Sequence, residues 1–273
     1  MRLPVGPTAP GATVDDAPRA LLELAHDLAV AAGDRAHAGR RGGLREVGTK
    51  TTTTDMVTEY DRATERDLVE TIRALRPDDS IVGEEGASHR GAGPHEWCID
   101  PIDGTTNFLY DLPGWAVSIG VADASGPLAG AVHVPALRET YTALRGAGAW
   151  RNGERIACSA ATDLSTALVC TGFSYARERR GPQAERVARM IPHLRDVRRL
   201  GAASIDLCFV ACGRLDAYFE ESLHPWDLAA GALVASEAGA RLGDFSGGPL
   251  RPAQVLVAAP GIFDALSRLI VGG

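Results

Sequence analysis

The stretch "CIDPIDGTTNF" brings together residue types that could bind metal ions and phosphate. Two aspartates, Asp100 and Asp103, stand on either side of Pro101. Because proline cannot continue a helical turn, we expect the two carboxylates to follow the end of an apolar strand rather than stack on a helix. Carboxylate oxygens and a backbone carbonyl, here that of Ile102, are ligands that hard cations such as Mg²⁺ take. The sequence therefore indicates a cation site.

The residues that follow are suited to binding an oxyanion. Gly104, Thr105 and Thr106 are expected to open a short helical turn, whose free backbone N–H groups can bind phosphate oxygens. Gly104 has no side chain and lets the backbone approach a ligand closely. Metal ligands placed directly before a phosphate cradle indicate metal-assisted phosphoryl chemistry.

Other carboxylates follow predicted elements, and each has a purely structural alternative. Asp61 could close a helix capping box with Thr58. Asp227 follows Pro225 at a predicted helix start, where the positive end of the helix favours a carboxylate. Glu84 could be a turn residue after a strand. Two like charges about 4 Å apart repel by ~1 kcal/mol in water and ~4 kcal/mol at an effective dielectric of 20, so a cluster of these carboxylates would need divalent cations.

The spacing of apolar residues predicts the elements that must position these side chains. Helices are expected over residues 15–39 and 56–75, and short β-rich runs follow as far as about residue 160. Strands and helices then alternate: strands near 167–171 and 196–200, helices near 183–194 and 203–212, a strand in "RLDAYFE", a helix in "PWDLAAGALVASEAG", a strand in "QVLVAA" and a helix in "GIFDALSRLI". The pattern predicts an α/β (α+β layered) fold, with helices packed on sheets.

The predicted elements form one compact unit of two lobes, for which 273 residues are sufficient. Residues 1–14, rich in Pro and Gly, are expected to be a flexible tail. Residues 15–160 would form an N-terminal α+β lobe that carries most of the candidate metal ligands. Residues 161–273 would form a C-terminal α/β lobe that closes the site.

Charge and composition argue against several classes of partner. The net charge is −7 and the pI is about 5.5, so neither nucleic acid nor a membrane surface is expected to bind. No apolar run approaches the roughly 18 residues of a membrane span, and the N-terminus lacks the apolar region of a secretory signal. The five cysteines are an odd number in apolar segments, which predicts reduced thiols and a cytoplasmic protein.

Lys50 is the only lysine among the 28 basic residues. An ammonium is a compact point charge on a flexible stem, whereas guanidinium is a planar fork. A site that requires the former would explain why this lysine is present. The alternative is a single lysine without a special role.

Three motifs, "GEEG", "DPIDGTTNF" and "WDLAAG", resemble in order and spacing those of the inositol monophosphatase family of Mg²⁺-dependent, lithium-sensitive phosphatases, and look most like its bacterial inositol-1-monophosphatases. The resemblance runs from about residue 20 to the end, and "RRLGAASIDLCFVACGRLDAYFE" resembles the segment between the last two motifs. It implies the alternating α-β-α-β-α sandwich that this family shares with fructose-1,6-bisphosphatases. It also implies a homodimer.

The resemblance further implies two or three Mg²⁺ per subunit. Glu84, Asp100 and the carbonyl of Ile102 would hold the first ion. Asp100, Asp103 and Asp227 would hold the second, so that Asp100 bridges both. A third, weaker ion would lie near Glu84 among waters.

The same resemblance implies roles around the substrate. Asp61 would hydrogen-bond Thr105, and this pair with Glu84 would orient and deprotonate the attacking water. Lys50 stands where family members carry a lysine in a flexible loop near the metals. The implied substrate-contacting positions are Asp103, Gly104, Thr105, Thr106, Gly201, Ala202, Ala203 and Glu220.

The chain departs from the family pattern at two places, neither of which is a metal ligand. The loop "KTTTTD" lacks the proline expected before its aspartate. Ala202 stands where a serine or threonine is expected after glycine, which removes a hydroxyl near the substrate pocket.

The expected activity is hydrolysis of inositol 1-phosphate, a small phosphate monoester, to inositol and phosphate by in-line attack of a metal-activated water. Histidinol phosphate and fructose 1,6-bisphosphate are alternative substrates within the same family. A metal-binding regulatory protein without turnover is the alternative outside enzymes. The complete set Asp61, Glu84, Asp100, Asp103, Thr105 and Asp227 argues against that last possibility.

Overall fold

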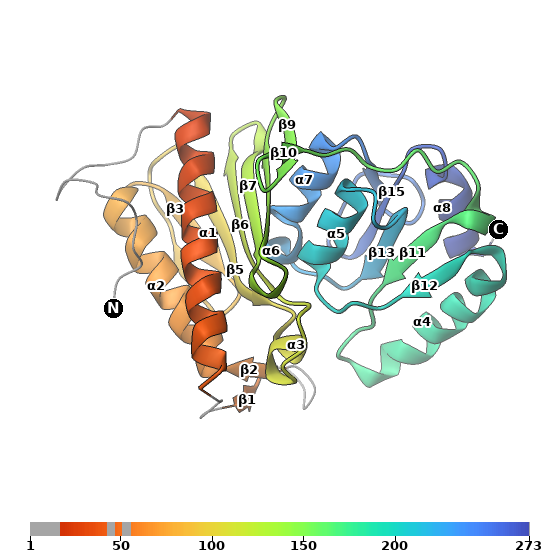
Figure 1. Ribbon diagram of the computed structural model, residues 1–273, viewed down its shortest axis with the longest axis horizontal. Helices are drawn as coiled ribbons and strands as arrows, with labels where there is room; N and C mark the ends of the chain where they lie inside the picture. Colours follow the sequence, from red (N-terminus) through yellow and green to blue (C-terminus); the bar gives the residue numbers. More distant parts are fainter. Residues whose placement is uncertain (1–16, 43–46, 51–55, 273) are drawn as a thin grey trace.

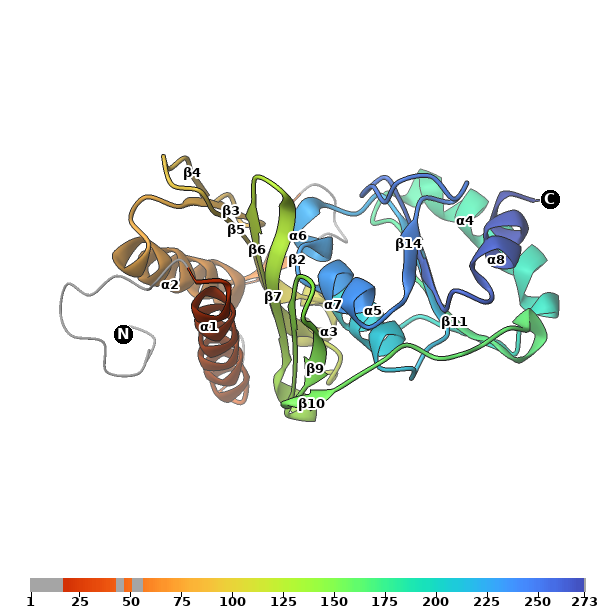
Figure 2. The same ribbon diagram turned by 90° about the horizontal axis from the view of Figure 1, so that it is seen from above.

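The computed structural model describes residues 17–42, 47–50 and 56–272. Helices and sheets alternate in layers across the long axis of the molecule (Figure 1), and the view from above shows the same order (Figure 2). The outer helices on one side are α1 (Pro18–Arg40) and α2 (Glu59–Leu75), the central ones α5 (Ala203–Ala211) and α7 (Gly231–Glu237), and those on the other side α4 (Arg177–Met190) and α8 (Phe263–Val271). This arrangement confirms the α-β-α-β-α sandwich.

The larger sheet lies between α1 and α2 on one face and α7 on the other (Figure 1). Its strand order is β10-β9-β8-β7-β6-β5-β3-β4, in which β3 and β5 are parallel and the other neighbours antiparallel. Its strands are β3 (Ser80–Gly83), β4 (Ser88–His89), β5 (Glu96–Asp103), β6 (Ala116–Asp123), β7 (Gly126–Val134), β8 (Glu139–Leu144), β9 (Gly148–Arg151) and β10 (Glu154–Arg155).

The smaller sheet has the order β12-β11-β13-β15-β14 and lies between the central helices and the outer pair α4 and α8 (Figure 1). The neighbours of β11 run parallel to it, while β15 runs antiparallel to both of its neighbours. Its strands are β11 (Leu168–Thr171), β12 (Asp196–Arg198), β13 (Ala217–Glu221), β14 (Arg241–Gly243) and β15 (Gln254–Ala258). The chain passes from the larger sheet to the smaller one between β10 and β11.

Helix α1 packs through one apolar face on the larger sheet. Leu21, Leu24 and Leu28 are buried, together with small residues that include Ala25 and Ala32. The predicted helix over 15–39 is thus confirmed within a few residues. Over the described parts of the chain, no helix combines the length and the apolar character that a bilayer span requires.

Helix α2 begins later than the sequence pattern predicted. Met56–Thr58 forms strand β2, which pairs antiparallel with β1 (Val47–Thr49). Thr58 is the N-cap of α2, its hydroxyl accepts the N–H of Tyr60, and Asp61 completes a capping box. The predicted start at residue 56 was wrong because this cap separates strand from helix.

Two other predicted helices also have different bounds. The helix predicted over 183–194 begins as early as Arg177 and includes Pro182. The helix predicted in "PWDLAAGALVASEAG" is divided into α6 (Pro225–Leu228) and α7, with Ala229 and Ala230 at the junction.

Glycines on the larger sheet explain how closely this junction approaches it. A Cβ at Gly120 of β6 would lie 2.6 Å from Cβ of Ala229, and one at Gly130 of β7 would lie 3.0 Å from Cα of Ala230. Small residues on both sides therefore let the break between the helices pack directly on the sheet. This packing positions Asp227, which belongs to α6.

We expect Gly120→Ala to lower the free energy of unfolding by about 1–3 kcal/mol, because the added methyl group must push α6 and the sheet apart. Gly181 in α4 is the matched control, since a Cβ there meets no atom within 4 Å. Gly181→Ala should raise the free energy of unfolding by up to ~1 kcal/mol through helix propensity. Urea unfolding measures both; a Gly120→Ala protein as stable as the wild type would contradict the packing argument.

Candidate active site

A cluster of carboxylates lies where the larger sheet meets the central helices. Asp100 and Asp103 at the end of β5 and Asp227 from α6 each offer an oxygen within 4.8 Å of the others. The pairing of β5 with β6 shifts register between Asp100 and Asp103, and Asp100 Oδ1 accepts the N–H of Ile102 over 3.1 Å. Strand β5 therefore continues through Pro101 to Asp103 with an irregularity in its pairing, and both aspartates reach one place.

Glu84 reaches the same cluster from the end of β3, the parallel neighbour of β5. Its carboxyl group interacts with that of Asp100. Lys50 Nζ lies 2.7 Å from Glu84 Oε1 and 2.5 Å from Glu85 Oε1. The structure thus brings Glu84 and Lys50 together with the aspartates, from four separate parts of the sequence.

Asp61 takes part in two sets of hydrogen bonds. Its Oδ2 accepts the N–H of Thr58 over 2.8 Å and the hydroxyl of Thr58 over 2.5 Å. Its Oδ1 lies 3.1 Å from the hydroxyl of Thr105, which is also 3.2 Å from the carbonyl oxygen of Ile102. Asp61 therefore caps α2 and contacts Thr105 at the same time, because Oδ2 accepts from Thr58 and Oδ1 accepts from Thr105.

Asp227 likewise serves its own helix. Its Oδ2 accepts the N–H of His224 over 2.6 Å, which caps α6. The ring of His224 stacks on Trp226 with 4.9 Å between centroids, and its Nδ1 lies 3.7 Å from Asp227 Oδ2, so this histidine both packs on Trp226 and contacts one of the clustered acids.

Burial and mutual repulsion raise the pKa values of the clustered acids. Burial raises the pKa of Asp61 to about 6. Burial and the charge of Asp227 raise the pKa of Asp103 to about 7, and burial with Glu84 raises that of Asp100 well above its usual range. The Glu84 pKa is also raised by burial, although Lys50 opposes this. Hard oxygen donors that repel one another in a buried place fit divalent cations such as Mg²⁺.

The turn after Asp103 has the backbone shape that a close approach requires. Gly104 has φ of +87°, and a Cβ there would lie 3.0 Å from the carbonyl oxygen of Gly114 and 3.1 Å from Cβ of Ala202. Helix α3 (Thr105–Leu109) begins directly after it, with Thr106 in its first turn. The first N–H groups of a helix have no partner within it.

The segment 200–204 of the other half of the molecule packs against this turn. Asn107 Nδ2 donates to the carbonyl oxygens of Gly114 over 2.5 Å and Leu200 over 2.8 Å. Gly201 has φ of +95°, and Ala202 and Ala203, at the start of α5, are buried. Asn107 was not among the predicted site residues, although the asparagine inside "DPIDGTTNF" was a visible signal.

Ser204 was also missed. Its N–H donates to Asp103 Oδ2 over 2.7 Å and its hydroxyl donates to the same oxygen over 2.5 Å. The only signal in the sequence was a serine in "GAAS", two residues after the position where a hydroxyl was expected.

Glu220 lies at the end of β13 beside the same region. Its Oε2 accepts the hydroxyl of Tyr218 over 2.7 Å. A side chain at Gly172 would collide with the Glu220 carboxylate, so glycine makes room for it. Burial raises the pKa of Glu220 to about 7, with Arg199 opposing and Asp227 adding to the shift.

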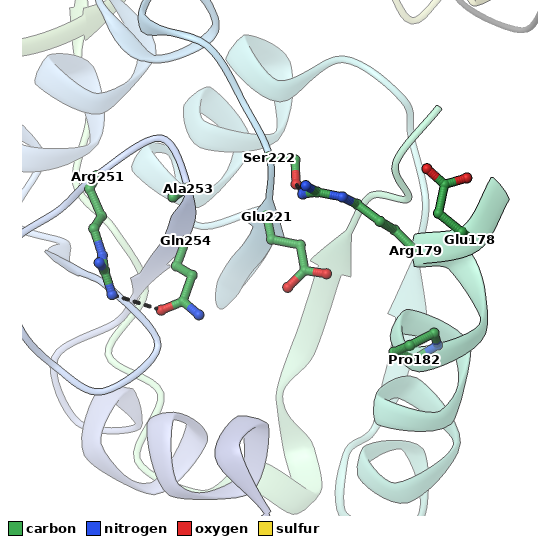
Figure 3. A pocket seen from close by; sticks show the side chains of 8 residues that line it. All are labelled: Glu178, Arg179, Pro182, Glu221, Ser222, Arg251, Ala253 and Gln254. Atoms are coloured by element: carbon green, nitrogen blue, oxygen red, sulfur yellow. Dashed lines mark hydrogen bonds between the residues drawn. The ribbon is translucent and has the colours of Figure 1, made fainter. Parts of the chain in front are cut away.

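A separate cleft of about 430 Å³ lies between the start of α4 and the adjoining ends of β13 and β15 (Figure 3). It is lined by Glu178, Arg179, Pro182, Glu221, Ser222, Arg251, Ala253 and Gln254, none of which is a predicted site residue. Glu221 follows Glu220, but successive strand residues point to opposite faces. Charged side chains that line the cleft have partners: Arg251 donates to Gln254 over 3.1 Å, and Glu221 forms an ion pair with Arg186 over 3.2 Å. We therefore do not assign the substrate to this cleft.

Two features of the sequence analysis lie outside the described residues. These are the predicted tail over 1–14 and the proline-free part of the "KTTTTD" loop, residues 51–55.

The raised pKa values predict how stability depends on pH when divalent ions are removed. The folded protein keeps protons on Asp103 and Asp61 that the unfolded chain has lost, so stability falls as pH rises from about 4 to about 7. We expect EDTA-treated protein to melt at a higher temperature near pH 5 than near pH 7.5. Added Mg²⁺ should raise the melting temperature near pH 7.5, by an amount equivalent to ~2.7 kcal/mol at a hundred times its dissociation constant.

Asp103→Asn isolates the contribution of one carboxylate. This variant should show a smaller fall in melting temperature over the same pH range, measured by calorimetry in EDTA. An unchanged pH dependence would show that the pKa of Asp103 is not raised in the folded protein.

Comparisons with known proteins find relatives along most of the chain. A curated relative, "Inositol-1-monophosphatase SuhB" from Mycobacterium tuberculosis, is 44% identical over 273 residues, which cover 92% of this chain and 93% of the relative. "Nus factor SuhB" from Pasteurella multocida is 40% identical, over 77% of this chain and 80% of its own.

A solved structure, "extragenic suppressor protein suhB" from Bartonella henselae, superposes with a TM-score of 0.88 at 31% identity, covering 93% of this chain and 99% of that one. The sequence model of the inositol monophosphatase family matches residues 18–270. The chain therefore belongs to the inositol monophosphatase family, a family of metal-dependent phosphatases.

Proposed function

We propose that the protein is a Mg²⁺-dependent phosphomonoesterase whose substrate is inositol 1-phosphate. The observation that carries this proposal is the meeting of Asp100, Asp103 and Asp227 within 4.8 Å, beside the hydrogen-bonded pair Thr105 and Asp61. The names of the mycobacterial relatives support the same substrate.

The residues fit Mg²⁺ in the way that the family resemblance implies. Glu84, Asp100 and the carbonyl of Ile102 would hold one ion, and Asp100, Asp103 and Asp227 a second, with a third near Glu84. When bound, Mg²⁺ would neutralise the carboxylates, lower the pKa of water and stabilise the negative charge on the phosphoryl group and the leaving oxygen. Phosphate monoester hydrolysis is among the slowest uncatalysed reactions, so this charge compensation is the main requirement.

Thr105 and Glu84 would position and deprotonate the attacking water. The Thr105 hydroxyl donates a hydrogen bond to Asp61. Its oxygen lone pairs would then be free to accept a hydrogen bond from water. The Glu84 carboxylate would lie beside the same water as its proton acceptor. Lys50 would shift away from Glu84 when a divalent ion takes over the compensation of charge.

The substrate would lie between the two halves of the molecule. The amides of Gly104 and Thr105, with Thr106 beside them, would bind the phosphate. Hydroxyl groups of the ring would donate to the carboxylates of Glu220 and Asp103, and the backbone at Gly201, Ala202 and Ala203 would complete the pocket.

Other functions remain as outcomes of the tests. Histidinol phosphate or fructose 1,6-bisphosphate could replace inositol 1-phosphate, since Glu220 would accept hydrogen bonds from an ammonium or from other sugar hydroxyls. A metal-binding regulator would bind Mg²⁺ without turnover. The homodimer, the cytoplasmic location and the absence of nucleic-acid and membrane partners stay predictions.

We expect Mg²⁺-dependent phosphate release from inositol 1-phosphate, inhibited by lithium, and loss of at least ~10³-fold in kcat for Asp100→Asn with the fold retained. Phosphate release over a panel of inositol, histidinol and sugar phosphates measures this, and circular dichroism checks the fold. Absence of release from the whole panel would reject the enzyme, and near-wild-type activity of Asp100→Asn would remove that residue from the site.

Glu220→Gln tests the assignment of the polyol pocket. Loss of a charged acceptor should raise KM for inositol 1-phosphate roughly tenfold, as expected for one hydrogen bond to a charged group. Phenyl phosphate carries no hydroxyl groups, so its KM should change less than about twofold. Equal effects on both substrates would show that Glu220 does not contact the polyol.

A further inference from the structure

We propose that Ser204 is a positioning residue for the cation site, whose two donors hold Asp103 in the orientation that Mg²⁺ binding requires. The inference rests on the proposed function, under which Asp103 is a metal ligand. Both residues are buried, and they are joined by hydrogen bonds of 2.7 Å from the Ser204 N–H and 2.5 Å from its hydroxyl.

Both donors reach the same carboxylate oxygen. Because they are bonded to Oδ2, the other oxygen of Asp103 is able to face Asp100 and Asp227. The terminal torsion of an aspartate is otherwise broad, and repulsion from two neighbouring carboxylates favours rotation away from them. Two donors on one oxygen fix that torsion before an ion arrives.

Asp103 in turn caps the helix that carries Ser204. Helix α5 begins at Ala203, and its N-cap residue, Ala202, makes no side-chain cap hydrogen bond. The N–H of Ser204, at the second position of α5, would lack a partner within the helix. A carboxylate from β5 supplies that partner, so the cap and the candidate cation site share one side chain.

The hydroxyl of Ser204 also accounts for a departure in the sequence. Ala202 stands where a hydroxyl residue was expected, whereas Ser204 supplies a buried hydroxyl two positions later. This hydroxyl contacts Asp103. Mutation of a residue that orients a metal ligand typically lowers metal affinity or activity by about 10–100-fold.

Two substitutions at Ser204 test the role of the hydroxyl. Ser204→Ala removes the hydroxyl but keeps the N–H, and Ser204→Cys keeps a side chain of similar size with a much weaker donor. We expect each to weaken Mg²⁺ binding to EDTA-treated protein about tenfold in calorimetric titration. The Mg²⁺ concentration for half-maximal phosphate release should rise in the same ratio.

Ser267→Ala is the matched control. Ser267 is a buried serine of α8 whose hydroxyl donates to the carbonyl oxygen of Phe245 over 2.8 Å, at the far side of the smaller sheet. Its removal deletes a comparable hydrogen bond without touching the carboxylates. Ser267→Ala should therefore bind Mg²⁺ as the wild type does.

The outcomes separate this inference from the proposed function. Wild-type affinity in Ser204→Ala overturns the inference, and so does wild-type affinity in Ser204→Cys, which would indicate packing alone. If Ser204→Ala does not fold, Ser204→Cys decides. A wild type that binds Mg²⁺ but releases no phosphate from any substrate rejects the proposed function, whereas weaker binding by the Ser204 variants still supports the positioning of Asp103.

Discussion

Repulsion among buried carboxylates is the constraint on which this structure depends. Asp100, Asp103, Asp227 and Glu84 come from β5, α6 and the end of β3, and the fold places them together, with Asp100 and Asp103 buried and Asp227 and Glu84 partly exposed. Hydrogen bonds to one oxygen of an acid recur around them: Thr58 holds Asp61, Ser204 holds Asp103 and the His224 N–H holds Asp227. Each bond is made to one oxygen of the acid, Oδ2 in all three. Hydrogen bonds from the surrounding secondary structure thereby oppose the electrostatic repulsion among the carboxylates.

The two halves of the molecule meet through small residues. Gly120 and Gly130 admit the break between α6 and α7, and Gly104 lies against Ala202. At each position a methyl group would separate surfaces that must touch. Glycine is thus used where the site requires close approach, whereas bulky buried apolar residues lie in the sheets and on the helices that pack against them, such as Leu68 of α2 and Phe263 of α8.

The sequence allowed the layered fold and the carboxylate cluster to be predicted, because "DPIDGTTNF" and "WDLAAG" carry specific residues in a specific order. It did not allow the start of α2 or the division of α6 from α7 to be predicted. The first depends on the pairing of β2 with β1, and the second on contact with glycines of another element. Ser204 was missed for the same reason, since its partner Asp103 is distant in sequence and becomes visible only after folding.

The position of α6 has a consequence for the order of events during synthesis. A ribosome releases β5, with Asp100 and Asp103, long before it releases Asp227, and domains generally fold from the N-terminus as they emerge. The nascent larger sheet therefore exposes an incomplete ligand set, and also the glycine surface of β6 and β7 on which Ala229 and Ala230 will pack. The set of Asp100, Asp103 and Asp227 is complete only when the C-terminal half has docked, so the growing chain lacks one ligand of the second proposed ion until then.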